Sequence, residues 1–326
     1  MYLTSVQVGI SQRRVEWVLK WCDRLLNAGA VNTSELEEGV GRLSFVAGIL
    51  DFPRPWLAPL FMFLARSPRG SIVALPAYVK FALKYLAYTV ADARLVPCAR
   101  RPLPLATALR VDAHAEGARA GVGAWLPHLD GDGNIVKELS PWLSVSLDAS
   151  NAPWAFSRGG EGFRTIASLE AFAIVLGIKF LLKDTGDVGD RWRHLTVIPA
   201  LTDNQSNGRT LTKVFTTKYP LAAVVMELGE ELRCRGLWSD VRWVPRASNE
   251  EADALSRGVT TGFADQLRAR ITLSEVPWRV FNEALSWGDE LGLGPAQLRA
   301  GRGQGHELGR GKRRRRGERL RDRDPW

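Results

Sequence analysis

The chain has 326 residues, of which 45% are hydrophobic and 12 are Trp, so it can build two cores and is not intrinsically disordered. Its net charge of +9 is uneven, because residues 301–326 carry ten Lys or Arg and four Asp or Glu and leave only +3 for residues 1–300. Three cysteines at distant spacings form neither a disulfide framework nor a zinc motif, which favours a reducing intracellular compartment, either nucleus or cytoplasm.

The first part of the chain has helical periodicity. Apolar residues recur at helical spacing in four segments, 11–29, 34–47, near 55–66 and near 77–92. Ser11 is a candidate cap and Gly29 a stop for the first helix, and a capping box at residues 34–37 predicts the start of the second. We therefore expect an all-helical unit over residues 1–95, followed by a proline-rich linker at 96–106.

After the linker the apolar period changes from helical to alternating, which indicates strands. The predicted elements are strands near 109–114, 121–126 and 135–147, a buried helix at about 166–183, a strand at 195–202, helical segments at about 205–217 and 220–235, a strand at 240–244 and a helix at 249–257. The order βββαβαβα over residues 107–258 describes an α/β layer with a mixed sheet. Residues 259–300 are predicted to be helical again, and residues 301–326 to form a disordered basic tail.

Four carboxylates occupy unusual places in these elements. Asp112 lies on the first strand and Glu170 interrupts an apolar helix, whereas Asp203 closes the fourth strand and Asp253 lies on the last helix. Acids held on rigid elements can chelate two Mg²⁺ ions roughly 3.5–4 Å apart, which activate a water and stabilise the leaving oxygen of a phosphodiester. The pattern therefore indicates a nuclease.

Each acid also has an ordinary structural explanation. Asp112 could be an outward residue of a half-solvated strand, and Glu170 could belong to a buried ion pair. Asp203 could cap the following helix, and Asp253 could pair with the arginine one turn on. Convergence of all four at one end of the sheet favours a shared site over four separate roles. His114, on the Asp112 face, is interpreted as an exposed strand residue.

Four motifs resemble the blocks of the ribonuclease H domain of retroelement reverse transcriptases: residues 110–113, 168–171, 201–204 and 243–257. The resemblance implies a ribonuclease H-like fold with a mixed five-stranded sheet. It also implies an endonuclease that cuts the RNA strand of RNA–DNA hybrids with two Mg²⁺ ions, for which Mn²⁺ can substitute, and leaves 5′-phosphate and 3′-hydroxyl ends.

The same resemblance implies a role for each acid. Asp112 would bridge both metals, and Glu170 would ligate one of them near the RNA 2′-hydroxyl. Asp203 would ligate the metal that activates water, and Asp253 would complete the shell of the second metal. A departure from the family is the loop at 244–249, which lacks the histidine that many ribonucleases H carry there.

The resemblance implies nucleic acid, an RNA–DNA hybrid, as the partner. No membrane association is expected, because no signal peptide and no bilayer-spanning apolar stretch occurs. The predicted contacts are Asn204, Asn249, Lys312, Arg313, Arg314, Arg315 and Arg316. The basic run that ends this set attracts phosphate, but a nuclear-import signal or a solvated terminus has the same composition.

The N-terminal helical segment resembles the thumb and connection region that follows the polymerase palm in retroelements. Residues 41–47 and 54–60 carry this resemblance, whereas the palm is missing and no Asp-Asp pair occurs in the chain. The sequence therefore resembles the C-terminal piece of a retroelement polyprotein, and a separate polymerase palm is an expected partner.

Two alternatives stay open at this stage. The first is an inactive remnant that only binds nucleic acid or braces a polymerase. The second is another nuclease of similar architecture. Proofreading exonucleases place a second acid two residues after the first, where this chain has His114, and transposases and integrases end in Glu, where it has Asp253.

Overall fold

A computed structural model describes residues 6–92, 95–157, 159–182 and 195–287 of the chain. The described chain forms two compact units, one within Gly9–Arg94 and the other within Leu95–Gly288 together with the first N-terminal residues. We call them the helical unit and the α/β unit. Within the described ranges, no helix is long and apolar enough to cross a bilayer.

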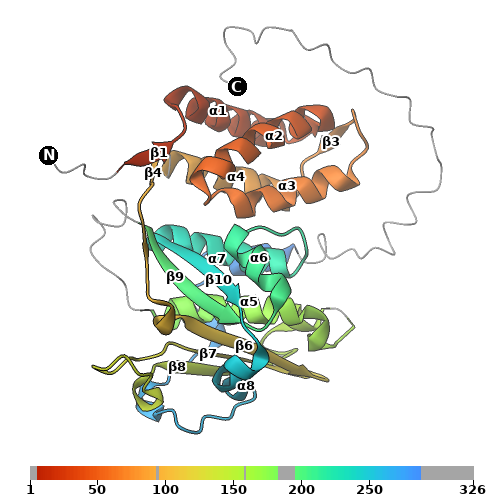
Figure 1. The fold of residues 1–326 in the computed structure, drawn as a ribbon. Helices are drawn as coiled ribbons and strands as arrows, with labels where there is room; N and C mark the ends of the chain where they lie inside the picture. Colours follow the sequence, from red (N-terminus) through yellow and green to blue (C-terminus); the bar gives the residue numbers. More distant parts are fainter. Residues whose placement is uncertain (1–5, 93–94, 158, 183–194, 288–326) are drawn as a thin grey trace, which may run out of the picture. The chain divides into compact units, whose positions relative to one another are not determined.

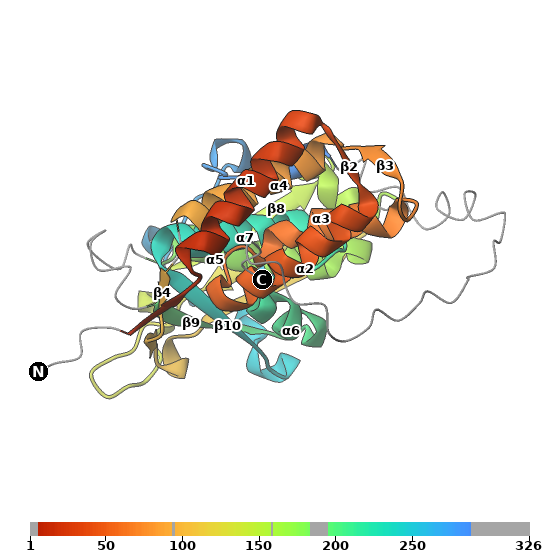
Figure 2. The ribbon, with the colours of Figure 1, turned by 90° about the horizontal axis from the view of Figure 1, so that it is seen from above.

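The helical unit consists of α1 (Gln12–Ala28), α2 (Thr33–Leu50), α3 (Arg54–Arg66), α4 (Ala77–Asp92) and the strands β2 (Ala30–Asn32) and β3 (Ile72–Ala74). Helix α1 packs on α4, and α3 packs on both α2 and α4 (Figures 1 and 2). Trp56 is buried in this core and stacks on Tyr85, with ring centroids 4.3 Å apart.

Two sequence predictions for this unit need correction. The unit is not all-helical, because β2 and β3 pair antiparallel. The second helix also begins earlier than the capping box indicated, since the Asn32 side chain accepts the Ser34 backbone N–H at 2.9 Å and therefore caps a helix that starts at Thr33. Gly29 ends α1 in the left-handed region, with φ of 66°, as predicted.

The α/β unit is built from β4 (Leu95–Pro97), β5 (Arg100–Pro102), β6 (Leu109–Glu116), β7 (Arg119–Trp125), β8 (Trp142–Asp148), α5 (Ile166–Phe180), β9 (Leu195–Thr202), α6 (Gln205–Lys213), α7 (Leu221–Arg235), β10 (Leu237–Trp243), α8 (Glu250–Ser256) and α9 (Phe281–Ser286). A short strand, β1 (Gln7–Gly9), pairs with β4.

The main sheet has the order β10-β9-β6-β7-β8 (Figure 1). Strands β6, β7 and β8 are antiparallel neighbours, whereas β9 runs parallel to β6 and to β10. The predicted order βββαβαβα and the mixed five-stranded sheet are confirmed. Strand β5, inside the predicted linker, adds a short sixth strand beside β9.

The third strand begins at Trp142 rather than near residue 135. Ile135 makes only an isolated bridge to Leu129, and a 3₁₀ turn at Lys137–Leu139 follows it. The Ser140 hydroxyl donates to the Val136 carbonyl at 2.8 Å, which holds this segment as a loop.

Helices α5 and α8 cover opposite faces of the sheet. Gly177 of α5 lies against the side chain of Leu109, which points to one face of β6. Asp112 points to the other face of β6, because residues an odd number apart on a strand alternate, and it contacts Ser256 of α8.

The helix predicted over residues 259–300 is absent from the part that the structure describes, except for α9. Residues 259–280 form an irregular strap with short 3₁₀ turns at Asp265–Leu267 and Leu273–Glu275, and residues 288–300 lie outside the described chain. Apolar side chains of the strap pack on residues that are distant in the sequence and do not form the apolar face of a helix. The ring of Phe263 lies 5.5 Å from that of Trp125 and 5.7 Å from that of Trp142.

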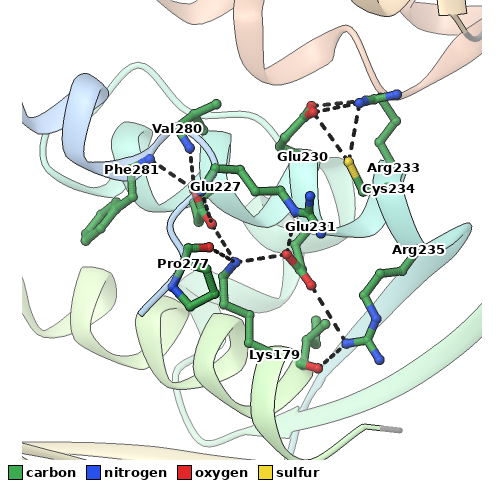
Figure 3. A network of polar contacts seen from close by, with 12 residues as sticks. Lys179, Glu227, Glu230, Glu231, Arg233, Cys234, Arg235, Pro277, Val280 and Phe281 are labelled. Atoms are coloured by element: carbon green, nitrogen blue, oxygen red, sulfur yellow. Dashed lines mark hydrogen bonds and ion pairs between the residues drawn. The ribbon is translucent and has the colours of Figure 1, made fainter. Parts of the chain in front are cut away.

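A buried polar network anchors the end of this strap on α7 (Figure 3). The Glu227 side chain is fully buried and accepts the backbone N–H groups of Arg279, Val280 and Phe281 at 2.9–3.1 Å. Lys179 of α5 lies 2.8 Å from the same carboxylate. The strap therefore supplies hydrogen bonds that a buried carboxylate cannot obtain from water.

We expect a chain that ends after Gly258 to be much less stable than one that ends after Trp287. The shorter chain leaves Glu227 without its three backbone donors, and loss of partners around a buried charge costs on the order of 3–5 kcal/mol. Urea unfolding followed by far-ultraviolet circular dichroism measures the difference. Equal unfolding midpoints for the two chains would show that the strap is dispensable.

Candidate active site

The register of two parallel strands places Asp112 beside Asp203. Strand β6 pairs with β9 at Leu109↔Ala200 and Arg110↔Leu201. Asp112 and Asp203 each follow the last of these paired residues by two positions, so they lie at the same level of neighbouring strands and on the same face. The two carboxylates therefore interact electrostatically.

Asp112 is the most strongly perturbed acid of the site. Its side chain is buried, with 4% of the residue exposed, and its carboxylate accepts a hydrogen bond from the Ser256 hydroxyl at 3.0 Å. Burial, the charge of Asp203 and the weaker effects of Glu170 and Asp253 raise the pKa of Asp112 to about 7, against the lowering effect of the Ser256 bond. The charges of all three other predicted acids thus act on Asp112.

Glu170 is held by donors from the end of β9 and the start of α6. Its carboxylate accepts hydrogen bonds from the Thr202 hydroxyl at 2.6 Å and from the amides of Asn204 and Asn207 at 3.1 and 3.4 Å. Burial is the main cause that raises the pKa of Glu170 to about 7; the charge of Asp203 adds to it and the three hydrogen bonds oppose it.

Asp253 is bound by two arginines. Its carboxylate lies 2.5 Å from the guanidinium of Arg246 and 3.0 Å from that of Arg257. Burial raises the pKa of Asp253, but the hydrogen bonds and charges of the two arginines outweigh it and hold the pKa below its ordinary value. The negative charge of Asp253 is thus balanced by two arginines, whereas Asp112 accepts a hydrogen bond from the uncharged Ser256 hydroxyl.

Helix α8 comes close enough to β7 to reach the acid cluster because β7 has glycine where the helix packs on it. Gly123 lies directly opposite Asp112 in the ladder, and a Cβ at Gly123 would lie 2.7 Å from the carbonyl oxygen of Ala252. Ser144 of β8 also donates to the Leu255 carbonyl at 2.6 Å. This close approach brings Asp253 and Ser256 over the sheet.

The predicted nucleic-acid contacts have different positions in the structure. Asn204 caps α6 by accepting the Ser206 N–H at 3.0 Å, and it also donates to Glu170. Asn249 is 1% exposed and donates to the Val111 carbonyl at 2.8 Å, so its observed role is to fix the start of α8. The contact of Asn249 with nucleic acid stays a prediction. The basic run Lys312–Arg316 lies outside the described residues.

Sequence reasoning missed the uncharged donors and one cation of the site. Thr202, Asn207 and Ser256 hold the acids, and Arg246 lies against one of them. For two of these residues, their spacing in the sequence could have identified them. Asn207 lies one helical turn after Asn204, and Ser256 lies one turn after Asp253.

The acids fit divalent metal ions in their chemistry. Carboxylate oxygens are the ligands that Mg²⁺ prefers. A cation would stabilise the charged forms of Asp112 and Glu170, whose pKa burial raises and the charge of Asp203 raises further. In the described ranges, however, no three His, Cys, Asp or Glu side chains already form a group that could hold an ion. The carboxylate of Glu170 is hydrogen-bonded to hydroxyl and amide groups, and that of Asp253 is paired with two arginines.

The strand order, the helices on both faces and the placement of the acids define an α/β protein with a ribonuclease H-like fold. The sequence matches no protein-family model and no curated protein.

Solved structures that are similar to the chain include the following two. Ribonuclease H1 of the halophilic archaeon Halobacterium salinarum NRC-1 has 21% sequence identity and a TM-score of 0.30, and the match covers 49% of this chain and 96% of that one. The N-terminal RNase H domain of a Mycobacterium tuberculosis protein, solved as a fusion with maltose-binding protein, has 15% identity and a TM-score of 0.29, with coverage of 47% and 91%. Similarity at this level carries no argument about activity, and the fold assignment rests on the observed strand order.

We expect Gly123→Ala to displace α8 and to lower the free energy of unfolding by roughly 1–3 kcal/mol, because the added methyl group collides with the helix backbone. Gly131→Ala is the matched control, since nothing lies within 4 Å of its Cβ position. Chemical unfolding of both variants tests this, and equal loss of stability in the two would contradict the close approach.

We also expect the metal-free protein to lose stability as the pH rises from about 4 to about 7. In the unfolded chain the carboxyl groups of Asp112 and Glu170 lose their protons near pH 4, whereas in the folded chain each pKa is about 7. Between these values the folded state binds more protons than the unfolded state, so the free energy of unfolding falls, by on the order of a few kcal/mol, and levels off above the folded pKa.

Unfolding in chelator across this pH range provides the measurement. Asp112→Asn should flatten the fall and be more stable than the wild type at pH 8, whereas Asp132→Asn, in an exposed loop, should follow the wild type. If Asp112→Asn is instead less stable at pH 8, the acid has a stabilising structural role and the repulsion argument fails.

Proposed function

We propose that the chain is a metal-dependent endonuclease that cleaves the RNA strand of RNA–DNA hybrids. The observation that carries this proposal is the convergence of Asp112, Glu170, Asp203 and Asp253. Burial, with the charges of the other three acids added to it, raises the pKa of Asp112 to about 7. A folded protein gains no stability from buried acids that repel one another, so the cluster indicates a site shaped for a cation and its substrate.

Four carboxylates would hold Mg²⁺, or Mn²⁺ in its place, and bound metal supplies charge stabilisation and an activated water for in-line cleavage of a phosphodiester. The chain's own residues fix the acids. Thr202 and Asn207 orient the carboxylate of Glu170, and Ser256 orients that of Asp112. Asp203 is less buried than these two acids and can accept a hydrogen bond from an incoming water.

The substrate class rests on the resemblance of the motifs to retroelement ribonucleases H. A 2′-hydroxyl distinguishes RNA from DNA at a given site, and Glu170 is the acid that this resemblance places near it. The same resemblance supports a retroelement setting, in which the polymerase palm is supplied separately, and a substrate-binding role for the basic tail at 301–326. These parts of the proposal stay predictions.

One observation favours a second candidate, an inactive protein that only binds nucleic acid or braces a polymerase. Asp253 is engaged by Arg246 and Arg257, so one of the four acids is already satisfied without metal. Under this alternative the hybrid would be bound and left intact.

We expect Asp112→Asn, Glu170→Gln and Asp203→Asn each to lower the rate of hybrid cleavage by roughly a hundredfold or more, because charge stabilisation by metal contributes several kcal/mol. Asp253→Asn should have a milder effect, since its carboxylate is shared with two arginines. Asp240→Asn is the control, because Asp240 lies on β10 and pairs with Arg242 instead of the cluster.

Cleavage of a labelled hybrid by the purified full chain, with Mg²⁺, with Mn²⁺ and in chelator, provides the readout. A wild type that binds the hybrid but never cuts it would favour the second candidate. Acid variants that cut at the wild-type rate would contradict the proposed site.

A further inference from the structure

The loop between β10 and α8 is fixed to the two strands that carry Asp112 and Asp203. The Trp243 indole N–H donates to the Asp203 carbonyl at 2.9 Å, and the Val244 N–H donates to the Thr202 carbonyl at 3.0 Å. Farther along the loop, Arg110 of β6 donates to the Ser248 carbonyl at 3.1 Å. The loop therefore has contacts with both strands of the acid cluster and presents its side chains at a defined place.

Arg246 lies in the middle of this loop and faces the acids. Its side chain is 64% exposed, and its guanidinium binds the Asp253 carboxylate at 2.5 Å. The hydrogen bond and charge of Asp253, followed by the charges of Asp203 and Asp112, raise the pKa of Arg246. Arg246 is thus a solvent-accessible cation at the rim of the cluster.

The bond between Arg246 and Asp253 is replaceable. Exposed ion pairs contribute about 0–1 kcal/mol, so an incoming anion can take the place of the carboxylate. Asp253 also keeps Arg257, whose guanidinium nitrogens lie 3.0 and 3.3 Å from its two oxygens, after Arg246 has left. Release of Arg246 therefore leaves no unpaired acid behind.

A nucleic-acid backbone that approaches four carboxylates is repelled unless a cation accompanies them. A guanidinium matches the geometry of a phosphate with two parallel hydrogen bonds and keeps its charge at every relevant pH. Arg246 combines this chemistry with exposure and with a fixed loop beside Asp203 and Asp253.

We propose that Arg246 contacts a backbone phosphate of the RNA strand beside the acid cluster, and that Asp253 is the acceptor that holds Arg246 when no nucleic acid is bound. This inference rests on the proposed function, because it takes an RNA–DNA hybrid as the ligand. It assigns to Asp253 a role in positioning Arg246, in addition to any role toward metal.

Equilibrium binding in chelator tests the inference without cleavage. Affinity of the full chain for a fluorescent RNA–DNA hybrid is measured over a salt series for the wild type, Arg246→Ala, Arg246→Lys and Arg242→Ala. Each phosphate contact contributes about 0.7–0.9 to the slope of log affinity against log salt. Arg242 is the matched control, because it is 56% exposed near the end of β10, just before the loop, but pairs with Asp240.

We expect Arg246→Ala to bind several-fold more weakly and to reduce the salt slope by about one contact. Arg246→Lys should restore the slope, because it keeps the charge, but only part of the affinity, because it lacks the two parallel donors. Arg242→Ala should match the wild type. Thermal melts of all variants control for folding, and Arg246→Lys keeps the test decisive should the alanine variant melt early.

A wild-type slope in Arg246→Ala would overturn the inference and leave the proposed nuclease function standing. An equal reduction in Arg242→Ala would also overturn it, because any surface cation would then have the same effect. A wild type that binds as expected but does not cut with Mg²⁺ would defeat the nuclease proposal while the phosphate contact stands. A wild type with no affinity for the hybrid would defeat both.

Discussion

The register of β6 against β9 is the constraint on which the acid cluster depends. Only Leu109↔Ala200 and Arg110↔Leu201 are paired between these strands, yet they fix the level of Asp112 relative to Asp203. A slip of one residue would turn one of these acids to the opposite face of the sheet. The other groups of the site are arranged around this pair: α5 brings Glu170 to the end of β9, and α8 brings Asp253 to the face of β6.

The protein balances the negative charges of the four acids to different extents. Asp112 and Glu170 are buried and each has a pKa of about 7, so they gain most from a nearby cation. Asp253 is bound by arginines and gains least. The cluster therefore has two differently compensated parts. Asp112 and Glu170 accept hydrogen bonds from uncharged hydroxyl and amide groups, whereas Asp253 is paired with two arginines.

Periodicity was sufficient to predict the order of elements in the α/β unit, and the bounds of β9 match the predicted 195–202. It failed where partners distant in sequence decide the structure. Residues 135–141, predicted as the start of the third strand, form a loop held by Ser140. Residues 259–280 include Phe263, which packs on Trp125 and Trp142 instead of lying on a helix.

The candidate acids could be identified from sequence because a carboxylate in an apolar element is unusual. Thr202 could not, since a threonine that ends a strand has no feature that marks it as a donor to Glu170. The pairing of Asp253 with Arg257 was anticipated as an alternative from its spacing of one turn. The approach of Arg246 depends on the path of a loop, which spacing alone does not define.

The strap also has a consequence for the association of the protein with itself. Strand β8 is one edge of the sheet, and an uncovered edge can pair with another chain. Here its outward carbonyls are occupied in succession: Trp142 by the Ala269 N–H, Ser144 by Arg268 and Ser146 by the Asn151 amide. The strap therefore covers the first part of this edge and Asn151 its end, which leaves fewer carbonyls of β8 open to pairing with another copy of the sheet.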